Sequence, residues 1–260
     1  MRIDLWSSLA GDDRQPYMET ALLETGVPRP LIVVCPGGGY THYGRYEGMQ
    51  IADKFNSLGF HAVVLRYRIQ PTRFPEPVAD LLRTIRIIRS RAAEWQVCPR
   101  QIAALGFSAG GHLALSAAIY HDKVDSTSGD EADAFSSRPD ALVLCYSAIS
   151  TKAEYGNPRI ARVLSNGETE EEILNATSLD EFVDSSLPPA FLWQTATDDT
   201  VNYKNSVAFA EKLWSAGVKA SLHIFPEGGH GKGLAEDAPD LRQWPELAAQ
   251  FLKTSCGFQA

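Results

Sequence analysis

Residues 102–112 have the sequence Ile102-Ala103-Ala104-Leu105-Gly106-Phe107-Ser108-Ala109-Gly110-Gly111-His112, in which a short apolar run leads into a glycine-rich turn. A second apolar run at residues 113–118 follows at once, so Gly106-x-Ser108-x-Gly110 lies between a predicted strand and a predicted helix. This is the setting in which G-x-S-x-G forms a nucleophile elbow, a strained turn that exposes the serine hydroxyl. Gly-rich turns also join strands to helices in many α/β proteins, so the motif alone leaves catalytic and purely structural roles for Ser108 open.

Short apolar runs alternate with helix-like segments along the chain, which predicts an α/β fold with a mostly parallel central sheet and helices on both faces. Residues 1–27 have the pattern of two short strands or irregular edge segments. A length of 260 residues is within the range of one α/β domain, so we expect a single domain over residues 1–260. The predicted strands are residues 31–35, 61–67, 101–107, 141–145, 191–195 and 220–225, and the predicted helices are residues 47–58, 78–95, 204–216 and 241–252.

Residues 147–187 interrupt this alternation with several turn signals and with an acidic run at residues 168–172. We expect them to form an insertion, or cap-like segment, with one or two short helices over the ends of the strands. Carboxylates interact favourably with the dipole at the start of a helix. The acidic run is therefore predicted to be the solvated first turn of a helix and not a metal site.

Three arginines, Arg83, Arg86 and Arg89, lie largely opposite the apolar face of the helix predicted at residues 78–95. The simplest interpretation is a solvated helix face. The formal net charge of −8 disfavours a nucleic-acid role, because phosphate binding needs a basic surface. It also gives no reason to expect attraction to anionic membranes, so we predict neither a nucleic-acid nor a membrane partner.

The cysteine pattern and the first residues favour a cytoplasmic location. None of the four cysteines is in a C-x-x-C pair, and Cys35 and Cys145 end strand-like runs, which predicts buried free thiols in a reducing compartment. Residues 1–6 have charges at positions 2 and 4 and no apolar h-region, so a signal peptide is not expected. No metal-ligand spacing is present, and we expect neither a metal nor a cofactor.

Three further features follow predicted strands, at the edge of a parallel sheet where reactive groups collect. Glycines at residues 37–39 follow the first buried strand, Asp198 and Asp199 follow the strand at residues 191–195, and His230 follows the last strand. The order Ser…Asp…His is that of α/β-hydrolases.

Each of these groups would have a defined chemical task in a catalytic triad. His230 would take the proton of Ser108 as general base and return a proton to the leaving group as general acid. An aspartate would orient the imidazole and stabilise the imidazolium that forms. The backbone N–H groups of Ala109, Gly38 and Gly39 would bind the oxyanion.

Four motifs also carry a family resemblance. The chain resembles the esterase group of α/β-hydrolases that includes acetyl-xylan and feruloyl esterases. It is similar more distantly to the hormone-sensitive-lipase group, whose His-Gly-Gly-Gly is replaced here by Pro-Gly-Gly-Gly at residues 36–39. The resemblance extends from about residue 30 to 235. The motifs are Cys-Pro-Gly-Gly-Gly-Tyr at residues 35–40, Gly-Phe-Ser-Ala-Gly-Gly-His at 106–112, Phe-Leu-Trp-Gln-Thr-Ala-Thr-Asp-Asp-Thr-Val at 191–201 and Phe-Pro-x-Gly-Gly-His-Gly at 225–231.

The resemblance implies the α/β-hydrolase fold and a serine carboxylester hydrolase that removes acetyl groups from oligosaccharides or small esters. It favours Asp198 over Asp199 as the acid of the triad, because Asp198 fits the family spacing Asp-x-x-Val against Val201. The other aspartate would then cap the following turn. Two positions beside the acid depart from the family pattern: Asn202 stands where relatives commonly have Pro, and Gln194 stands where many have His.

Residues 40–47 are rich in aromatic side chains beside the expected oxyanion hole. Aromatic faces suit a sugar ring, so at least one of Tyr40, Tyr43 and Tyr46 is expected to contact the substrate. The alternative is that these tyrosines pack over a neighbouring strand.

Other functions are compatible with the same motifs. An amidase such as an arylformamidase, or a peptidase, would use the same triad on C–N bonds. A non-catalytic ligand-binding protein of this fold is a further alternative, although such proteins typically lose a triad residue. The expected partner is a small-molecule ester such as an acetylated oligosaccharide, and the sequence leaves the oligomeric state open.

Overall fold

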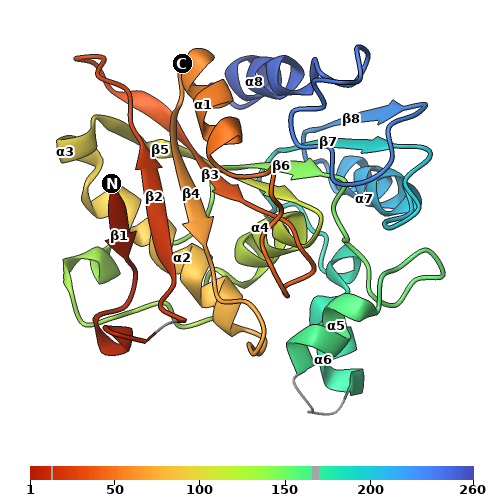
Figure 1. The fold of residues 1–260 in the computed structure, drawn as a ribbon, viewed down its shortest axis with the longest axis horizontal. Helices are drawn as coiled ribbons and strands as arrows, with labels where there is room; N and C mark the ends of the chain where they lie inside the picture. Colours follow the sequence, from red (N-terminus) through yellow and green to blue (C-terminus); the bar gives the residue numbers. More distant parts are fainter. Residues whose placement is uncertain (13, 166–169) are drawn as a thin grey trace.

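A computed structural model describes residues 1–12, 14–165 and 170–260, and an eight-stranded sheet runs through its middle (Figure 1). The strands have the spatial order β1-β2-β4-β3-β5-β6-β7-β8. β2 pairs antiparallel with β1 and with β4, and the other neighbouring strands are parallel, which confirms the expected mostly parallel sheet. The strands are β1 (Arg2–Asp4), β2 (Tyr17–Ala21), β3 (Arg29–Cys35), β4 (His61–Arg66), β5 (Val97–Phe107), β6 (Ala141–Cys145), β7 (Ala190–Thr195) and β8 (Ala220–Phe225).

Strand β3 explains why apolar runs without alternation form this sheet. Leu31 and Val33 pack into one core while Ile32 and Val34 pack into the other, because successive side chains of a strand point to opposite faces. Helices α1 (Met49–Ser57) and α8 (Trp244–Ser255) cover the second face, whereas α2 (Glu76–Ser90), α4 (Ala109–Tyr120) and α7 (Lys204–Ser215) cover the first (Figure 1). The expectation of helices on both faces is therefore confirmed.

The single helix predicted at residues 78–95 is divided in the structure. α2 ends at Ser90, and a short separate helix, α3 (Ala92–Trp95), follows it. Arg91 between them has φ −97° and ψ 11°, outside the α-helical region, so the two helices are not continuous. The other predicted strands and helices overlap the observed elements.

Residues 147–187 contain α5 (Arg159–Ser165), α6 (Glu170–Thr177) and the short 3-10 helix η3 (Leu179–Glu181). Figure 1 shows α5 and α6 together at the lower right of the molecule, below α4 and α7. Ile160 and Leu164 of α5 belong to the same core as α4, so this segment packs on the body of the fold. Glu171 and Glu172 are exposed in the first turn of α6, as predicted. Glu168 and Thr169 of the acidic run lie outside the described residues.

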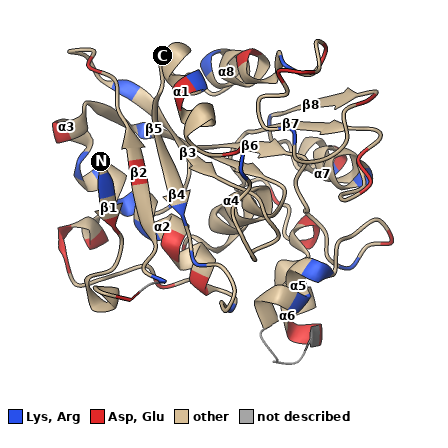
Figure 2. Cartoon of the chain, in the orientation of Figure 1, with Lys and Arg blue, Asp and Glu red and all other residues tan. Residues whose placement is uncertain are grey.

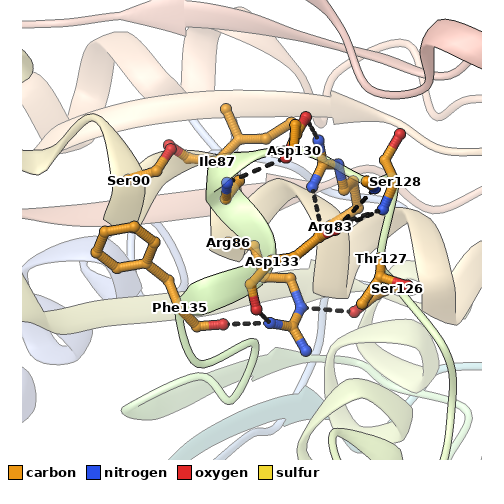
Figure 3. Close-up of polar contacts among 12 residues, drawn as sticks. Arg83, Arg86, Ile87, Ser90, Ser126, Thr127, Ser128, Asp130, Asp133 and Phe135 are labelled. Atoms are coloured by element: carbon orange, nitrogen blue, oxygen red, sulfur yellow. Dashed lines mark hydrogen bonds and ion pairs between the residues drawn. The ribbon is translucent and has the colours of Figure 1, made fainter.

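The arginines of α2 do not form the solvated helix face that the sequence predicts. Arg83 is only 2% exposed, although its position is opposite the apolar stripe. Its guanidinium forms ion pairs with Asp130, directly before the 3-10 helix η2 (Glu131–Ala134), and with Asp133 inside it (Figure 3). It also donates to the carbonyl oxygen of Leu5.

Arg86 and Arg89 bind the same stretch of chain. Arg86 donates to the hydroxyl of Ser126 at 2.9 Å and to the carbonyl oxygen of Asp133 at 2.8 Å (Figure 3). Arg89, 8% exposed, pairs with Asp140 at 2.9 Å. The prediction was wrong because residues 126–140 fold back over α2 and supply the polar partners that water would otherwise supply. Helical periodicity contains no information about such a segment, 40 or more residues away along the chain.

Charged residues of both signs are interspersed over the helices and loops, and the central strands have few of them (Figure 2). In the described part of the chain no helix is both long enough and apolar enough to span a bilayer. The four cysteines are free, and Cys35 and Cys145 are fully buried, as their strand positions predict.

Replacement of Arg83 tests the corrected interpretation of α2. We expect Arg83→Ala to lower the free energy of unfolding by about 2 to 3 kcal/mol, because two carboxylates lose their cationic partner and the carbonyl oxygen of Leu5 loses a donor. Arg100→Ala, at an exposed position, is the matched control and should change it by less than about 0.5 kcal/mol. Urea unfolding monitored by tryptophan fluorescence measures both. Equal effects of the two substitutions would restore the solvated-face interpretation.

Candidate active site

Ser108 lies at the tip of a tight turn between β5 and α4. Its backbone has φ 52° and ψ −116°, a conformation that non-glycine residues rarely adopt. The flanking glycines allow this turn: a Cβ on Gly106 would lie 2.0 Å from the carbonyl oxygen of Gly110, and one on Gly110 would lie 2.1 Å from that of Cys35. The predicted geometry of the elbow, with close backbone packing around an exposed side chain, is therefore present.

The structure brings Ser108, His230 and Asp198 into one hydrogen-bonded chain. His230 Nε2 lies 2.9 Å from Ser108 Oγ, and His230 Nδ1 lies 2.7 Å from Asp198 Oδ2. An ionised carboxylate only accepts hydrogen bonds, so this geometry matches the neutral tautomer in which Nδ1 donates to Asp198 and Nε2 accepts from the serine hydroxyl. These three side chains follow β5, β8 and β7 at the same edge of the sheet.

Asp198 is held in place by several donors, whereas its neighbour is not. Asp198 Oδ1 accepts hydrogen bonds from the backbone N–H groups of Thr200 at 2.9 Å and Val201 at 2.8 Å. The Asp198 side chain has no exposed surface. Asp199 is exposed, and its carboxylate accepts a hydrogen bond from the Thr200 hydroxyl. The geometry therefore favours Asp198 as the partner of His230.

Gln194, one of the two positions that depart from the family pattern, contacts the Asp198 carboxylate directly. Its side-chain N–H₂ donates to Asp198 Oδ2 at 3.1 Å and to the carbonyl oxygen of Val201 at 2.6 Å, while its Oε1 accepts from Ser206 at 2.8 Å. Gln194 is completely buried and thus fixes the Asp198 carboxylate from the side opposite the backbone donors. The sequence signal for this contact was a glutamine near the end of a mostly apolar strand, four residues before Asp198.

The predicted oxyanion donors lie on the loop after β3 and at the start of α4. Gly38 and Gly39 have φ values of 118° and 61°, and Ala109 is the first residue of α4, directly after Ser108. The N–H of Gly37 donates to the buried carboxylate of Glu47 at 2.7 Å, which holds the loop. In the described residues, Gly38 and Gly39 donate no backbone hydrogen bond to protein, so their N–H groups are available to a ligand.

A cavity of about 270 Å³ opens beside Ser108. A second hollow of about 500 Å³ lies next to it, and Tyr46, His230 and Gly231 border both. Tyr46 is 57% exposed, so its ring is accessible at the junction of the two. The residues around the first cavity are Gly38, Gly39, His42, Gly44, Arg45, Tyr46, Glu47, Ser108, Asn157, Arg159, Ile160, Thr200, His230 and Gly231.

The other two tyrosines expected to contact substrate do not border these hollows. Tyr40 is 1% exposed, and its hydroxyl lies 2.9 Å from His112 Nδ1 in the core. Tyr43 packs edge-on against Tyr67 and donates its hydroxyl to the carbonyl oxygen of that residue. This placement corrects the expectation for Tyr40 and Tyr43, whose hydroxyls face inward because the protein interior supplies their hydrogen-bond partners.

Among the described residues, no three His, Cys, Asp or Glu side chains are grouped closely enough to hold a metal ion. The groups that the structure gathers at the site are a hydroxyl, an imidazole, a carboxylate and backbone N–H donors. This combination is suited to acyl transfer.

A comparison with protein families finds that residues 23–213 match the BD-FAE family model. The chain belongs to the BD-FAE family. Among characterised relatives, it is 33% identical over 226 residues to endo-1,4-beta-xylanase B of Butyrivibrio fibrisolvens and 30% identical over 228 residues to an acetylxylan esterase of Xylanibacter ruminicola. These alignments cover 85% and 86% of this chain, which spans 35% and 45% of the lengths of the two relatives.

Solved structures show the same fold for this BD-FAE chain. An acetyl ester-xyloside bifunctional hydrolase from Caldicellulosiruptor lactoaceticus aligns with a TM-score of 0.91 and 36% identity, covering 100% of this chain and 97% of the other. The carboxylesterase Cest-2923 from Lactobacillus plantarum aligns with a TM-score of 0.81 and 25% identity, covering 100% and 98% of the two chains. The expected α/β-hydrolase fold is confirmed.

His112, which follows the elbow, is a structural histidine of this BD-FAE chain. It has no exposed surface, and its Nε2 lies 3.0 Å from the carbonyl oxygen of Thr177 at the end of α6. Together with the contact from Tyr40, this ties α4, the helix after Ser108, to the loop after β3 and to the segment at residues 147–187. Burial lowers the pKa of His112 to about 4, so the imidazole stays neutral in the folded protein.

The buried His112 predicts a specific loss of stability in acid. In the unfolded chain its pKa returns to about 6.5, so between that value and about 4 only the unfolded state binds the proton. Protonation of the unfolded chain therefore lowers the free energy of unfolding as the pH falls, by about 2 kcal/mol between about pH 8 and pH 5. His112→Gln should have a lower free energy of unfolding than the unsubstituted protein at pH 8. Its free energy of unfolding should then fall by about 2 kcal/mol less than that of the unsubstituted protein between about pH 8 and pH 5, because the variant has no imidazole at this position. Urea unfolding curves at several pH values measure the difference, and parallel pH profiles would contradict it.

Proposed function

We propose that this chain is a serine carboxylic ester hydrolase that works through an acyl-enzyme. The observation that carries the proposal is the hydrogen-bonded chain from Ser108 through His230 to Asp198, which borders a cavity next to Gly38 and Gly39. The named esterase relatives support the same class of reaction.

In the proposed mechanism, Ser108 Oγ attacks the acyl carbonyl carbon while His230 Nε2 takes the hydroxyl proton. The carbonyl oxygen becomes an oxyanion and is bound by the N–H groups of Ala109 and of Gly38 or Gly39. When the tetrahedral intermediate collapses, the ester C–O bond breaks and His230 gives its proton to the leaving alcohol. Water then attacks the acyl-enzyme with His230 again acting as base, which releases the carboxylic acid and restores Ser108.

We propose an acetyl group on an oligosaccharide, or on a related small ester, as the substrate. An acetylxylan esterase and an acetyl ester-xyloside hydrolase are among the relatives that match this chain. The cavity beside Ser108, about 270 Å³, suits a short acyl group. The neighbouring hollow of about 500 Å³ could hold sugar units beyond the ester. The accessible ring of Tyr46, at the junction of the two, could lie against a sugar ring.

A substrate panel tests this proposal. We expect kcat/KM for p-nitrophenyl acetate to exceed that for the octanoate by about tenfold or more, since the cavity accommodates short chains better. Acetylated xylo-oligosaccharide should release acetate, whereas N-formylkynurenine and dipeptide anilides should react slowly. Failure to cleave any short-chain ester would overturn the proposal that the chain is an ester hydrolase. A tenfold higher kcat/KM for N-formylkynurenine than for the esters would indicate an amidase instead.

Tyr46→Ala extends this panel to the sugar part of the substrate. The substitution should raise KM for acetylated xylo-oligosaccharide by about tenfold, through the loss of roughly 1.4 kcal/mol of contact with a sugar ring. Its effect on p-nitrophenyl acetate, which has no sugar, should stay within about twofold. Equal effects on both substrates would show that Tyr46 shapes the site without touching a sugar.

Asp198→Asn and Asp199→Asn are a matched pair of variants that test which of the two aspartates is the acid of the proposed triad. Loss of the Asp198 carboxylate should lower kcat by about 10³- to 10⁴-fold, because His230 then takes the wrong tautomer. Asp199→Asn should leave kcat within about twofold, since that side chain faces solvent. Steady-state kinetics on p-nitrophenyl acetate measures both. A larger loss with Asp199→Asn would transfer the role to that residue.

A further inference from the structure

Glu47 is a buried carboxylate beneath the active-site cavity and outside the Ser108, His230 and Asp198 chain. It is 4% exposed, and within the described residues no Lys or Arg lies at ion-pair distance from it. A buried carboxylate without a cation is costly, so it persists only where hydrogen bonds and function favour it. Each of its two oxygens accepts a hydrogen bond from a different segment of the site.

One oxygen binds the loop after β3. Glu47 Oε2 accepts the N–H of Gly37 at 2.7 Å, directly before the expected oxyanion donors Gly38 and Gly39. The loop wraps closely around this carboxylate: a Cβ on Gly44 would lie 2.1 Å from Oε2, and the N–H of Gly44 donates to the carbonyl oxygen of Gly37. The carboxylate therefore occupies a space that the loop glycines leave open for it.

The other oxygen binds Tyr146, which contacts the catalytic histidine. Tyr146 follows β6, is fully buried, and donates its hydroxyl to Glu47 Oε1 at 2.6 Å. Its ring packs edge-on against His230, with centroids 4.8 Å apart. Its hydroxyl oxygen also accepts the N–H of Gly233 at 3.2 Å, three residues after the histidine. Burial, together with the Glu47 carboxylate, raises the pKa of Tyr146 well above its usual value, so the phenol stays a neutral donor.

The loop after β3 and the loop after β8 also touch directly at this point. A Cβ on Gly233 would lie 2.3 Å from the carbonyl oxygen of Tyr46, the residue before Glu47. The carbonyl oxygen of Gly233 accepts a hydrogen bond from the indole of Trp244 at 2.9 Å. Glu47 thus lies where the segment with the oxyanion donors meets the segment with the general base.

We propose that Glu47 is a positioning residue which, through Tyr146, holds the oxyanion loop and the His230 loop in one relative placement. Its two oxygens connect Gly37 on one side with Tyr146 on the other, and Tyr146 supports both the His230 ring and the backbone at Gly233. The inference rests on the proposed roles of Ser108 and His230. A misplacement of about 1 Å between reacting groups can cost about 10²-fold in rate, so this connection is expected to affect kcat.

Three variants test the connection: Glu47→Gln, Tyr146→Phe and the double variant. Glutamine keeps the shape of Glu47 but can no longer accept from both Gly37 and Tyr146, while phenylalanine keeps the ring against His230. We expect each single variant to lower kcat for p-nitrophenyl acetate by about 10- to 100-fold, with KM within about threefold. The double variant should lose little more than the worse single variant, because both break one connection.

Asp140→Asn is the matched control for the loss of a partly buried carboxylate. Asp140 pairs with Arg89 and accepts the N–H of Ile102, just before β6 and so at the sheet edge opposite Ser108. It should lower the melting temperature while leaving kcat unchanged. All rates are measured well below melting and are expressed per active serine, counted by titration with a p-nitrophenyl phosphonate. The phosphonylation rate of Ser108 should fall in the Glu47 and Tyr146 variants, with one serine still titrated per chain.

Several outcomes would overturn the proposal. If Glu47→Gln keeps the original kcat per titrated serine, or if its loss matches that of Asp140→Asn, the carboxylate is only structural. Losses that multiply in the double variant would show that Glu47 and Tyr146 act separately. If Glu47→Gln does not fold, Tyr146→Phe decides by the same criteria. An unsubstituted chain that neither hydrolyses the ester nor reacts with the phosphonate would overturn the proposed function, and this inference with it.

Discussion

The close approach of three backbone segments at Gly106 and Gly110 is the constraint on which the active site depends. Strands β3 and β5 and helix α4 come together there at distances that leave no space for a Cβ. The turn between them holds Ser108 at φ 52° and ψ −116°, and the packed segments on either side maintain this strained conformation. Because β3 is so close, the loop that follows it lies beside the Ser108 hydroxyl and can supply backbone donors to the same ligand.

The polar groups around this turn form continuous hydrogen-bonded chains with few gaps. Asp198 receives donors from Gln194 and from the backbone on its other side, and it orients His230 in turn. Glu47 and Tyr146 form a second hydrogen-bonded pair, and the ring of Tyr146 packs edge-on against His230. In a protein interior such bonds are strong and an unpaired group is costly, so a network of this kind favours one arrangement of the site.

The corrected predictions share a physical cause. Arg83 and Arg89 were assigned to solvent because helical periodicity separates apolar from polar positions, but residues 126–140 cover that face and pair with the guanidinium groups. Tyr40 was one of three tyrosines considered for substrate contact because the loop lies beside the glycine turn, yet its hydroxyl reaches His112 in the core. A side chain with an apolar body and a polar end can face either way, and only its partners decide which.

The sequence by itself determined the alternation of strands and helices, the glycine turn at Ser108 and the order in which the reactive residues follow the strands. These features depend on local patterns and on chain order, both of which one sequence contains. Only the tertiary structure brought Asp198, and not Asp199, to hydrogen-bond distance from His230, brought Gln194 to Asp198, and placed Glu47 between two loops far apart along the chain. Those assignments depend on contacts between residues that are far apart in the sequence; Glu47 and Tyr146, for example, are separated by 99 residues. Such residues come into contact only once the sheet has formed.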